Sequence, residues 1–405
     1  MVCAVAVATI YVAQPILAQL GSDLGIPEAE LGWIVAAGQL GYLAGLVLLV
    51  PLGDMLDRRT LIVGQLLLAA VGTGLASTAT GSLSLLAGLV VTGLFAVVVQ
   101  TTVAFAADLA DADDRGRTIG LLTAGVIVGI LGARVLAGLL TGLWGWRSSY
   151  LVLGTLLVVL AVVVRRVLPA DRRSGPARYG PLVTSLGKLF REPLFVSRGL
   201  IAFFMFASFG TLWSGLALPL ADEPWHLDAA QIGMFGVAGL AGALGAARAG
   251  AWADAGRADL ITGGALVLLG ASWVATGQAS WSLVLVVVGV VLLDFAVQAA
   301  HVSNQHLLTT VYEQHTSSVV GGYMVFYSFG SALGATATTA AYAAAGWPGS
   351  AVLGGAFASG GVLVWVVSRR TVARSQACRN AVAACESTDS VSAARMVDSR
   401  RQCCQ

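Results

Sequence analysis

Four polar side chains recur at helical spacing inside an otherwise apolar stretch, and they are strong candidates for chemistry. They are spaced by four, three and four residues, at Asp294, Gln298, His301 and Gln305. This spacing places them on one face of a helix. Such a polar stripe is typical either of a cavity wall or of hydrogen bonds that hold helices together. We expect Asp294 and Gln298 to line a cavity, whereas both interpretations stay open for His301 and Gln305.

Other polar residues stand alone among apolar neighbours. Arg134 lies about 17 residues into an apolar run, or ~25 Å along a helix, and Asp294 lies ~20 Å along its own helix. An ionisable side chain is costly in hydrocarbon unless it faces protein or a wet cavity, so both are functional candidates. Gln14 and Gln100 are single amides that could hold a substrate or satisfy a neighbouring side chain. We predict that these four residues, with Gln298 and His301 of the polar stripe, form a substrate and proton pathway.

The composition is suited to a lipid bilayer. Of the 405 residues, 57% are hydrophobic and 11% are charged, whereas soluble proteins contain about 25% charged residues. Apolar runs of about 20 residues can cross a membrane as helices. We count twelve such runs, at 2–20, 31–52, 60–78, 82–107, 117–142, 148–167, 196–220, 229–252, 259–277, 281–306, 317–341 and 347–368. The sequence therefore predicts an all-α membrane protein with twelve transmembrane helices.

Arginines mark one side of the membrane at nearly every turn. Arg58 and Arg59 stand between the second and third runs, and further arginines follow the fourth, sixth, eighth and twelfth runs. The turns on the opposite side contain only Arg147. Because Lys and Arg collect in cytoplasmic loops, we predict a multi-pass protein of the cell membrane with both termini in the cytoplasm.

A basic segment containing Pro and Gly divides the spans six and six. We predict four parts: a six-helix bundle at 1–167, a cytoplasmic linker at 168–195, a second six-helix bundle at 196–368 and a polar tail at 369–405. The polar composition of the tail predicts a disordered segment.

The two halves also repeat. Asp54, in the turn between the second and third spans, has a counterpart 200 residues later in Asp254, between the eighth and ninth spans. Both turns continue into arginine, at Arg58 and at Arg257. Parallel duplication of a six-helix unit is a known transporter architecture.

The turn itself reads Pro51-Leu52-Gly53-Asp54-Met55-Leu56-Asp57-Arg58-Arg59. It resembles the major facilitator superfamily signature Gly-x-x-x-Asp-Arg-x-Gly-Arg-Arg/Lys. A register on Asp57 matches Gly53 and Arg58, but we prefer Asp54 as the signature acid because Asp254 then aligns with it. The resemblance covers about residues 1–368. It implies two six-helix bundles that alternate access.

Other stretches are similar to a bacterial branch of exporters in that superfamily. They are Tyr11-Val12-Ala13-Gln14-Pro15, the glycine-rich segment 129–138, and Asp294-Phe295-Ala296-Val297-Gln298 with Val302-Ser303-Asn304-Gln305. Ala133-Arg134 stands where the drug:proton antiporters usually have Gly-Pro. In this superfamily helices 1, 4, 7 and 10 line the central cavity and helix 5 packs between the halves. The resemblance therefore allows an attraction between Arg134 and Asp294 across the halves.

The same resemblance assigns a second group of residues to a cytoplasmic latch that closes the inner gate. We predict that this conformational gate consists of Gly53, Asp54, Arg58, Arg59, Asp254 and Arg257.

The sequence points to secondary transport of a small molecule. It contains no Gly-x-x-x-x-Gly-Lys-Ser/Thr phosphate loop and no nucleotide-binding domain. An ion gradient or the substrate's own gradient is then the energy source, and a proton is the economical choice of ion because Asp294 is titratable and burial favours its neutral form. We predict export by proton antiport. The alternatives are an uncoupled facilitator and a proton symporter that imports a small metabolite.

Several other functions are not favoured. We see neither a paired Asp/Asp nor a His/Glu metal cluster, so we predict that the protein is not an enzyme and has no cofactor or metal. The net charge of +2 gives no reason to expect nucleic acid. We expect a small-molecule substrate and the lipid bilayer as partners, and no obligate protein partner. The spacing of the tail cysteines, Cys378, Cys385, Cys403 and Cys404, matches no metal site.

Overall fold

The computed structural model describes residues 1–110, 114–170, 187, 189–245, 258–312 and 316–388. Asp254 and Arg257 of the repeated turn lie outside the described residues, as do Cys403 and Cys404. Most of the predicted linker at 168–195 also lies outside them.

The N-terminal half contains six spans, and some of them are divided into shorter helical segments. In chain order its helices are α1 (Val2–Tyr11), η1 (Gln14–Ile16), α2 (Leu17–Leu24), η2 (Glu28–Glu30), α3 (Gly32–Leu48), η3 (Val50–Asp54), α4 (Arg58–Ser77), α5 (Ser82–Ala96), α6 (Val98–Leu109), α7 (Arg115–Trp144) and α8 (Trp146–Val167). The first span runs from α1 through α2, and the fourth consists of α5 and α6.

The C-terminal half repeats this order. Its helices are α10 (Pro193–Gly215), α11 (Ala217–Ala221), α12 (Ala229–Gly245), α14 (Ala258–Thr276), α15 (Leu283–Val311) and α16 (Thr316–Thr388). Helix α16 contains two spans, because Gly346 has φ 63° and ψ −164° and breaks the helix. Glycine populates this left-handed region readily, so the chain can reverse there between the eleventh and twelfth spans.

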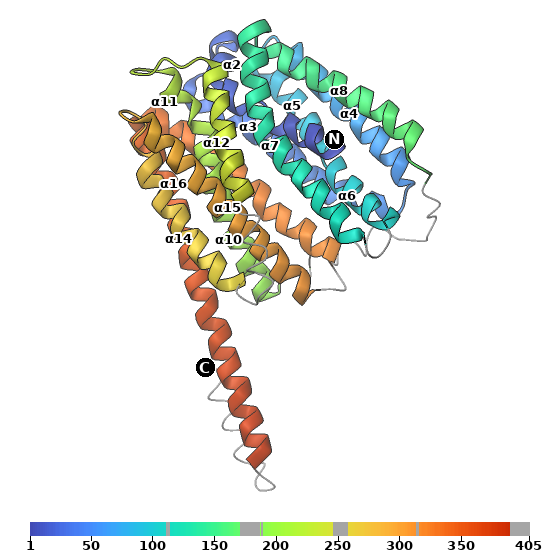
Figure 1. Cartoon of the computed structure of the whole chain (residues 1–405), viewed down its shortest axis with the longest axis vertical. Coiled ribbons are helices and arrows are strands. Elements are labelled where there is room, and N and C mark those ends of the chain that lie inside the picture. Colours follow the sequence, from blue (N-terminus) through green and yellow to red (C-terminus); the bar gives the residue numbers. More distant parts are fainter. Residues whose placement is uncertain (111–113, 171–186, 188, 246–257, 313–315, 389–405) are drawn as a thin grey trace.

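The predicted count of twelve spans is confirmed. Ten helices in the described part of the chain are long and apolar enough to cross a membrane. Helix α12 is a shorter apolar helix whose described part ends at Gly245, and α16 counts twice because of its break at Gly346. Figure 1 shows the two halves side by side, with the blue-to-teal N-terminal half next to the green-to-orange C-terminal half.

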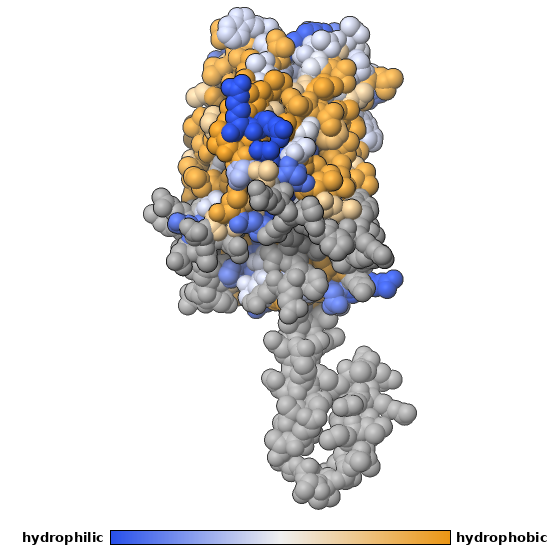
Figure 2. Space-filling model, turned by 90° about the vertical axis from the view of Figure 1, so that its right-hand side faces the viewer, coloured by the Kyte–Doolittle hydropathy of each residue, from blue (hydrophilic) through white to orange (hydrophobic). Residues whose placement is uncertain are grey.

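Apolar side chains cover the outer surface of the bundle. Figure 2 shows a broad apolar surface over the described part of one face, interrupted by a strip of hydrophilic residues in its upper middle. Large apolar side chains stay exposed along α8 and α15, among them Val158, Val162, Val284 and Val288. This is the surface that lipid would cover, because a helix in a bilayer has no need to bury its apolar face against protein.

We call the end of the bundle that carries Arg58 and Arg165 the basic end, and the end that carries Arg147 and Gly346 the far end. The closest contacts between the halves lie toward the far end. Gly32 and Gly138 have no side chain, and the contacts leave no room for one. A Cβ added to Gly32 would lie 2.1 Å from the carbonyl oxygen of Ala335, and a Cβ added to Gly138 would lie 2.2 Å from the carbonyl oxygen of Ala229. Only glycine permits such close approach of two helix backbones.

A hydrogen bond between the halves accompanies this contact. The backbone N–H of Gly32, at the start of α3, donates to Thr339 Oγ1 on α16 at 3.1 Å. Helix α3 has no side-chain cap from its own chain neighbours. Thr339 therefore satisfies one of the unpaired N–H groups that every helix start exposes, and it does so from the other half of the molecule.

The tail differs from its prediction. Helix α16 continues to Thr388, so the first part of segment 369–405 is helical rather than disordered, and Figure 1 shows it leaving the bundle at the basic end. Alanine and arginine, which recur in this stretch, are strong helix formers, and the twelfth span supplies a helix that is already nucleated. Residues 389–405 lie outside the described part.

Candidate functional site

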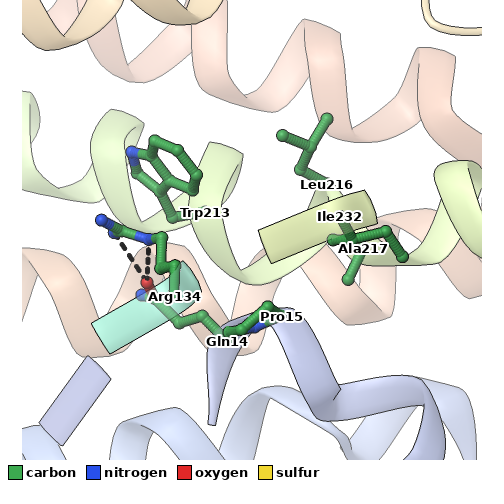
Figure 3. Close-up of a pocket in the computed structure, with 7 residues that line it drawn as sticks. All are labelled: Gln14, Pro15, Arg134, Trp213, Leu216, Ala217 and Ile232. Carbon is green, nitrogen blue, oxygen red and sulfur yellow. Dashed lines mark hydrogen bonds between the residues drawn. The ribbon is translucent and has the colours of Figure 1, made fainter. Parts of the chain in front are cut away.

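Arg134 is the centre of the candidate site. It lies on α7 and is only 1% exposed. Its Nε and Nη2 atoms donate to Gln14 Oε1 at 3.1 and 2.8 Å, and its Nη1 donates to the carbonyl oxygen of Ile130 at 3.2 Å. Figure 3 shows the Gln14 amide oxygen directed at the guanidinium. Gln14 thus belongs to the site as the hydrogen-bonding partner of a buried cation.

The backbone near Gln14 explains how this amide reaches the centre. Gln14 begins the short 3-10 helix η1, which interrupts the first span between α1 and α2. Pro15 follows directly, and proline removes a backbone donor and breaks the regular helical ladder. The sequence Gln14-Pro15 therefore produces a local irregularity at the level of Arg134.

Aromatic rings surround the guanidinium. The Arg134 Cζ atom lies 3.7 Å from the ring centroid of Trp213, 5.6 Å from that of Tyr11 and 5.7 Å from that of Phe209. Ring faces attract a cation, and the attraction is stronger where water is excluded. Among the aromatic residues of the seventh span, Phe209 and Trp213 thus face Arg134, whereas Phe204 packs against Gly360 of α16.

Asp294 lies close to this cluster but is not joined to it by an ion pair. It is 1% exposed on α15, and its Oδ2 atom has no hydrogen-bond partner. Both Asp294 and Arg134 are described, and no salt bridge links them; Arg134 bonds to Gln14 and Ile130 instead. The attraction expected across the halves is therefore an interaction at longer range.

The rest of the polar stripe points toward aromatic neighbours nearer the basic end. The His301 ring contacts Phe206 edge to face at 5.3 Å between centroids, and it lies 5.5 Å from Tyr323 and 6.5 Å from Tyr327. These rings come from α10 and α16, so His301 faces the inside of the C-terminal half. Gln298, one turn away toward Asp294, is half-buried.

Gln100 is held separately. Its Nε2 donates to the Tyr42 hydroxyl at 2.6 Å, which links α6 to α3. Its Oε1 is buried without a partner. The structure thus brings Gln14, Arg134 and Asp294 together at the centre and gives Gln100 a neighbour of its own.

Two residues of this region were missed from the sequence. Trp213 lies against Arg134 but is one aromatic residue among several in an apolar span, so nothing in its spacing distinguishes it. Gln39 on α3 is fully buried, and neither its Oε1 nor its Nε2 has a partner. Its signal, a single amide among apolar residues, was the same as that of Gln14 and could have been found.

A small cavity joins the halves beside Arg134 (Figure 3). Its volume is about 10 Å³, roughly the space of one water molecule. It is lined by Gln14, Pro15, Arg134, Trp213, Leu216, Ala217 and Ile232. The lining comes from both halves, so a rearrangement of the halves would change this space directly.

Two of the predicted gate residues, Arg58 and Arg59, form hydrogen bonds within the N-terminal half. Arg58 donates from Nε to the carbonyl oxygen of Gly53 at 2.8 Å and pairs with Asp108, at the end of α6, at 2.5 Å. Asp57 caps α4 by accepting from the backbone N–H of Thr60.

Arg59 extends the same arrangement to the sixth span, since its Nη1 donates to the carbonyl oxygen of Leu168 at 3.2 Å. Asp54 ends η3. The structure thus shows the start of α4 tied to the ends of α6 and α8 at the basic end, while Asp254 and Arg257 lie beyond the residues that it describes.

The C-terminal half has a matching arrangement with opposite charge. Asp259, which stands 200 residues after Arg59 at the start of α14, pairs with Arg198 on α10 at 2.6 Å and with Arg369 on α16 at 3.0 Å. Arg198 also donates to Asn304 Oδ1 on α15 at 3.3 Å. In each half, the start of the third helix therefore holds neighbouring helix ends together.

Among the described residues there is no group of three or more His, Cys, Asp or Glu side chains that could hold a metal ion. The chemistry available at the centre is that of a buried cation, a buried carboxyl and several aromatic rings. Such groups can bind a charged or hydrogen-bonding ligand and can take up a proton.

Known proteins resemble this chain over most of its length. The pattern of the Major Facilitator Superfamily matches residues 1–217. The uncharacterized transporter YgaY of Escherichia coli O157:H7 is 38% identical over 361 residues, which are 89% of this chain and 92% of that protein. The chloramphenicol resistance protein of Streptomyces lividans is 30% identical over 223 residues, which are 50% of this chain and 56% of that protein.

A solved structure has the same fold. It is a bacterial homolog of the human lysosomal transporter Spinster, in an inward-facing and occupied conformation. The TM-score is 0.76 at 15% sequence identity, and the match covers 91% of this chain and 95% of that one. Together with the matching family pattern, these relatives indicate a membrane transporter rather than an enzyme. The chain belongs to the major facilitator superfamily.

Proposed function

We propose that this protein exports a small organic molecule across the cell membrane in exchange for protons, by alternating access. The observation that carries the proposal is Asp294, a fully buried carboxyl whose Oδ2 has no hydrogen-bond partner. A carboxyl that is not fixed by an ion pair can gain and lose a proton without breaking a network. An ionisable group in such a position within a membrane protein is a functional candidate.

Arg134 has a different role in this proposal. Its guanidinium is already held by Gln14, Ile130 and the face of Trp213. It is therefore a fixed cation near the site where substrate and proton alternate. Its charge favours the ionised form of Asp294 when the proton has left.

The arrangement of the halves supports alternating access. We place the basic end in the cytoplasm, following the positive-inside rule. The close contacts at Gly32 and Gly138 then close the outer side. A rocking of the halves that breaks these contacts would expose the centre to the outside.

Export is favoured over import by one relative. The matching protein from Streptomyces lividans is named for chloramphenicol resistance, and a transporter that protects a cell from a small molecule would carry it outward. We therefore place a small organic molecule at the centre and assign outward transport to this chain.

The proposal is tested first by finding a ligand. A thermal-shift screen of the purified full chain would begin with chloramphenicol as the probe, because a ligand that binds the folded state raises its melting temperature. Compounds that raise it are then loaded into proteoliposomes, and transport is followed under an imposed pH gradient.

The key variant is Asp294→Asn, with Asp222→Asn, an exposed aspartate, as the matched control. We expect Asp294→Asn to lose transport driven by the pH gradient while it still inserts into liposomes, and Asp222→Asn to keep it. Normal transport against a gradient by Asp294→Asn would contradict the coupling role. If the transport rate of the wild-type protein does not depend on the pH gradient, the protein is an uncoupled facilitator. If the substrate moves in the same direction as protons, the protein is a symporter.

A further inference from the structure

Trp213 lies near both charges of the central site. Its ring lies under the Arg134 guanidinium, with 3.7 Å between Cζ and the ring centroid. The ring also lies near Asp294, because both side chains border Gly239 of α12. A Cβ added to Gly239 would lie 2.8 Å from Trp213 Cζ2 and 3.0 Å from Asp294 Oδ2. The edge of the indole next to its N–H thus lies beside the carboxylate. The Trp213 Nε1 and Asp294 Oδ2 atoms are both buried without another partner.

Opposite charges that meet in a low-dielectric interior attract strongly, and separating them again is costly. A direct contact between Arg134 and Asp294 would hold the carboxylate ionised. The Trp213 ring covers one face of the Arg134 guanidinium, so that this face is closed to the carboxylate, and it stabilises the cation. Arg134 acts on Asp294 through its charge, and the nearby Trp213 N–H also favours the carboxylate.

The surrounding backbone keeps this arrangement tight. A Cβ on Gly236 would lie 2.7 Å from the carbonyl oxygen of Leu131 and 3.1 Å from Arg134 Cβ. A Cβ on Gly233 would lie 2.6 Å from the carbonyl oxygen of Arg134. These glycines bring α12 against α7, so Arg134 has little freedom to move around the indole.

We propose that Trp213 is a positioning residue that keeps Arg134 and Asp294 apart, so that the Asp294 carboxyl remains able to exchange its proton during transport. The proposal rests on the proposed function, in which Asp294 carries the proton. In each cycle the proton adds to a carboxylate oxygen of Asp294 from water on one side and leaves to water on the other. Trp213 takes no part in the proton transfer itself.

The test measures protonation directly and needs no known substrate. Infrared difference spectra of the full chain in lipid follow the carbonyl stretch of protonated carboxyl groups as the pH is changed. The Asp294 contribution is the part that is absent in Asp294→Asn. We expect its midpoint to move to lower pH by about one unit or more in Trp213→Ala, because the effect of an opposite charge in direct contact outweighs the loss of the Trp213 N–H, which acts in the other direction.

Two further variants sharpen the result. Trp213→Phe keeps a ring over the guanidinium, so we expect less than half the shift. Adding Arg134→Gln to Trp213→Ala removes the cation and should reverse the shift. If Trp213→Ala does not fold, as judged by size-exclusion chromatography, Trp213→Leu replaces it, and a shift in the same direction is expected.

The outcomes separate the two proposals. If Asp294→Asn removes no titrating band, Asp294 is not the proton carrier, and both proposals fail. If that band is lost in Asp294→Asn but keeps its wild-type midpoint in Trp213→Ala or Trp213→Leu, only the role of Trp213 is overturned. A shift that persists after Arg134→Gln is added would also overturn it, because the shift would then not come from the guanidinium.

Discussion

Arg134 is a buried cation held by a neutral amide rather than by an acid. Gln14 Oε1 accepts two of its hydrogen bonds from a position 120 residues away in the chain. Gln14→Ala removes both bonds and leaves a charged donor buried, so we expect a loss of about 2 kcal/mol in the free energy of unfolding. A thermal unfolding curve would show a lower melting temperature, and transport should fall with it.

The control for this prediction is Gln19→Ala. Gln19 lies in the same span, on α2, but is exposed, so its loss should change the melting temperature little. Equal melting temperatures for the two variants would mean that the Gln14 amide is not needed to hold Arg134.

At the scale of elements, Asp259 joins three helices of the C-terminal half at the basic end. Asp259→Asn removes the carboxylate from Arg198, whose side chain is 6% exposed. We expect a destabilisation of about 1–2 kcal/mol, less than for a fully buried pair because the Asp259 side chain is 32% exposed. The exposed Arg369 contributes less, so Arg369→Ala should lower the melting temperature less than Asp259→Asn does. The reverse order would contradict this division of roles.

The contact between α3 and α16 gives a second prediction at this scale. In Gly32→Ala, the added Cβ would overlap the carbonyl oxygen of Ala335, so the far end cannot close fully. Leu218 lines a groove at the far end together with Gly21, Pro27 and Leu31. In a chain with its native cysteines replaced, a thiol placed at Leu218 should then react faster with a water-soluble reagent.

Gly74→Ala is the matched control for the α3 contact, because nothing lies within 4 Å of a Cβ built on this helical glycine. It should leave the labelling rate at its wild-type value. A Gly32→Ala variant that labels no faster than Gly74→Ala would show that the helices adjust without opening.

For the molecule as a whole, the orientation in the membrane is the first property to test. The basic residues predict both termini in the cytoplasm. Green fluorescent protein fused after Gln405 should therefore fluoresce, and alkaline phosphatase fused at the same point should be inactive. Active phosphatase would reverse the orientation and, with it, the direction of transport proposed here.

The fold was predictable because a long apolar run identifies a membrane span from its own residues, without knowledge of the helices that pack against it. Each predicted run forms a span. The centre was only partly predictable. Arg134 and Asp294 stood out as charges in apolar stretches, but the bond from Arg134 to Gln14 depends on how distant helices pack. Trp213 could not be singled out, since its role comes from its place near two charges. The helical start of the tail was missed because its composition alone does not show that the twelfth span continues into it.

The hydrogen bond from the Gly32 N–H to Thr339 makes the opening of the far end depend on water. When the halves separate there, the Gly32 N–H loses Thr339, and α3 has no side-chain cap of its own to replace it. Water is the partner that an opened gap can supply. Opening of this gate is thus a hydration step, and osmolytes that lower water activity should shift the population toward the closed far end. The speed of the transport cycle would then depend on the osmotic state of the surroundings as well as on the ion gradient.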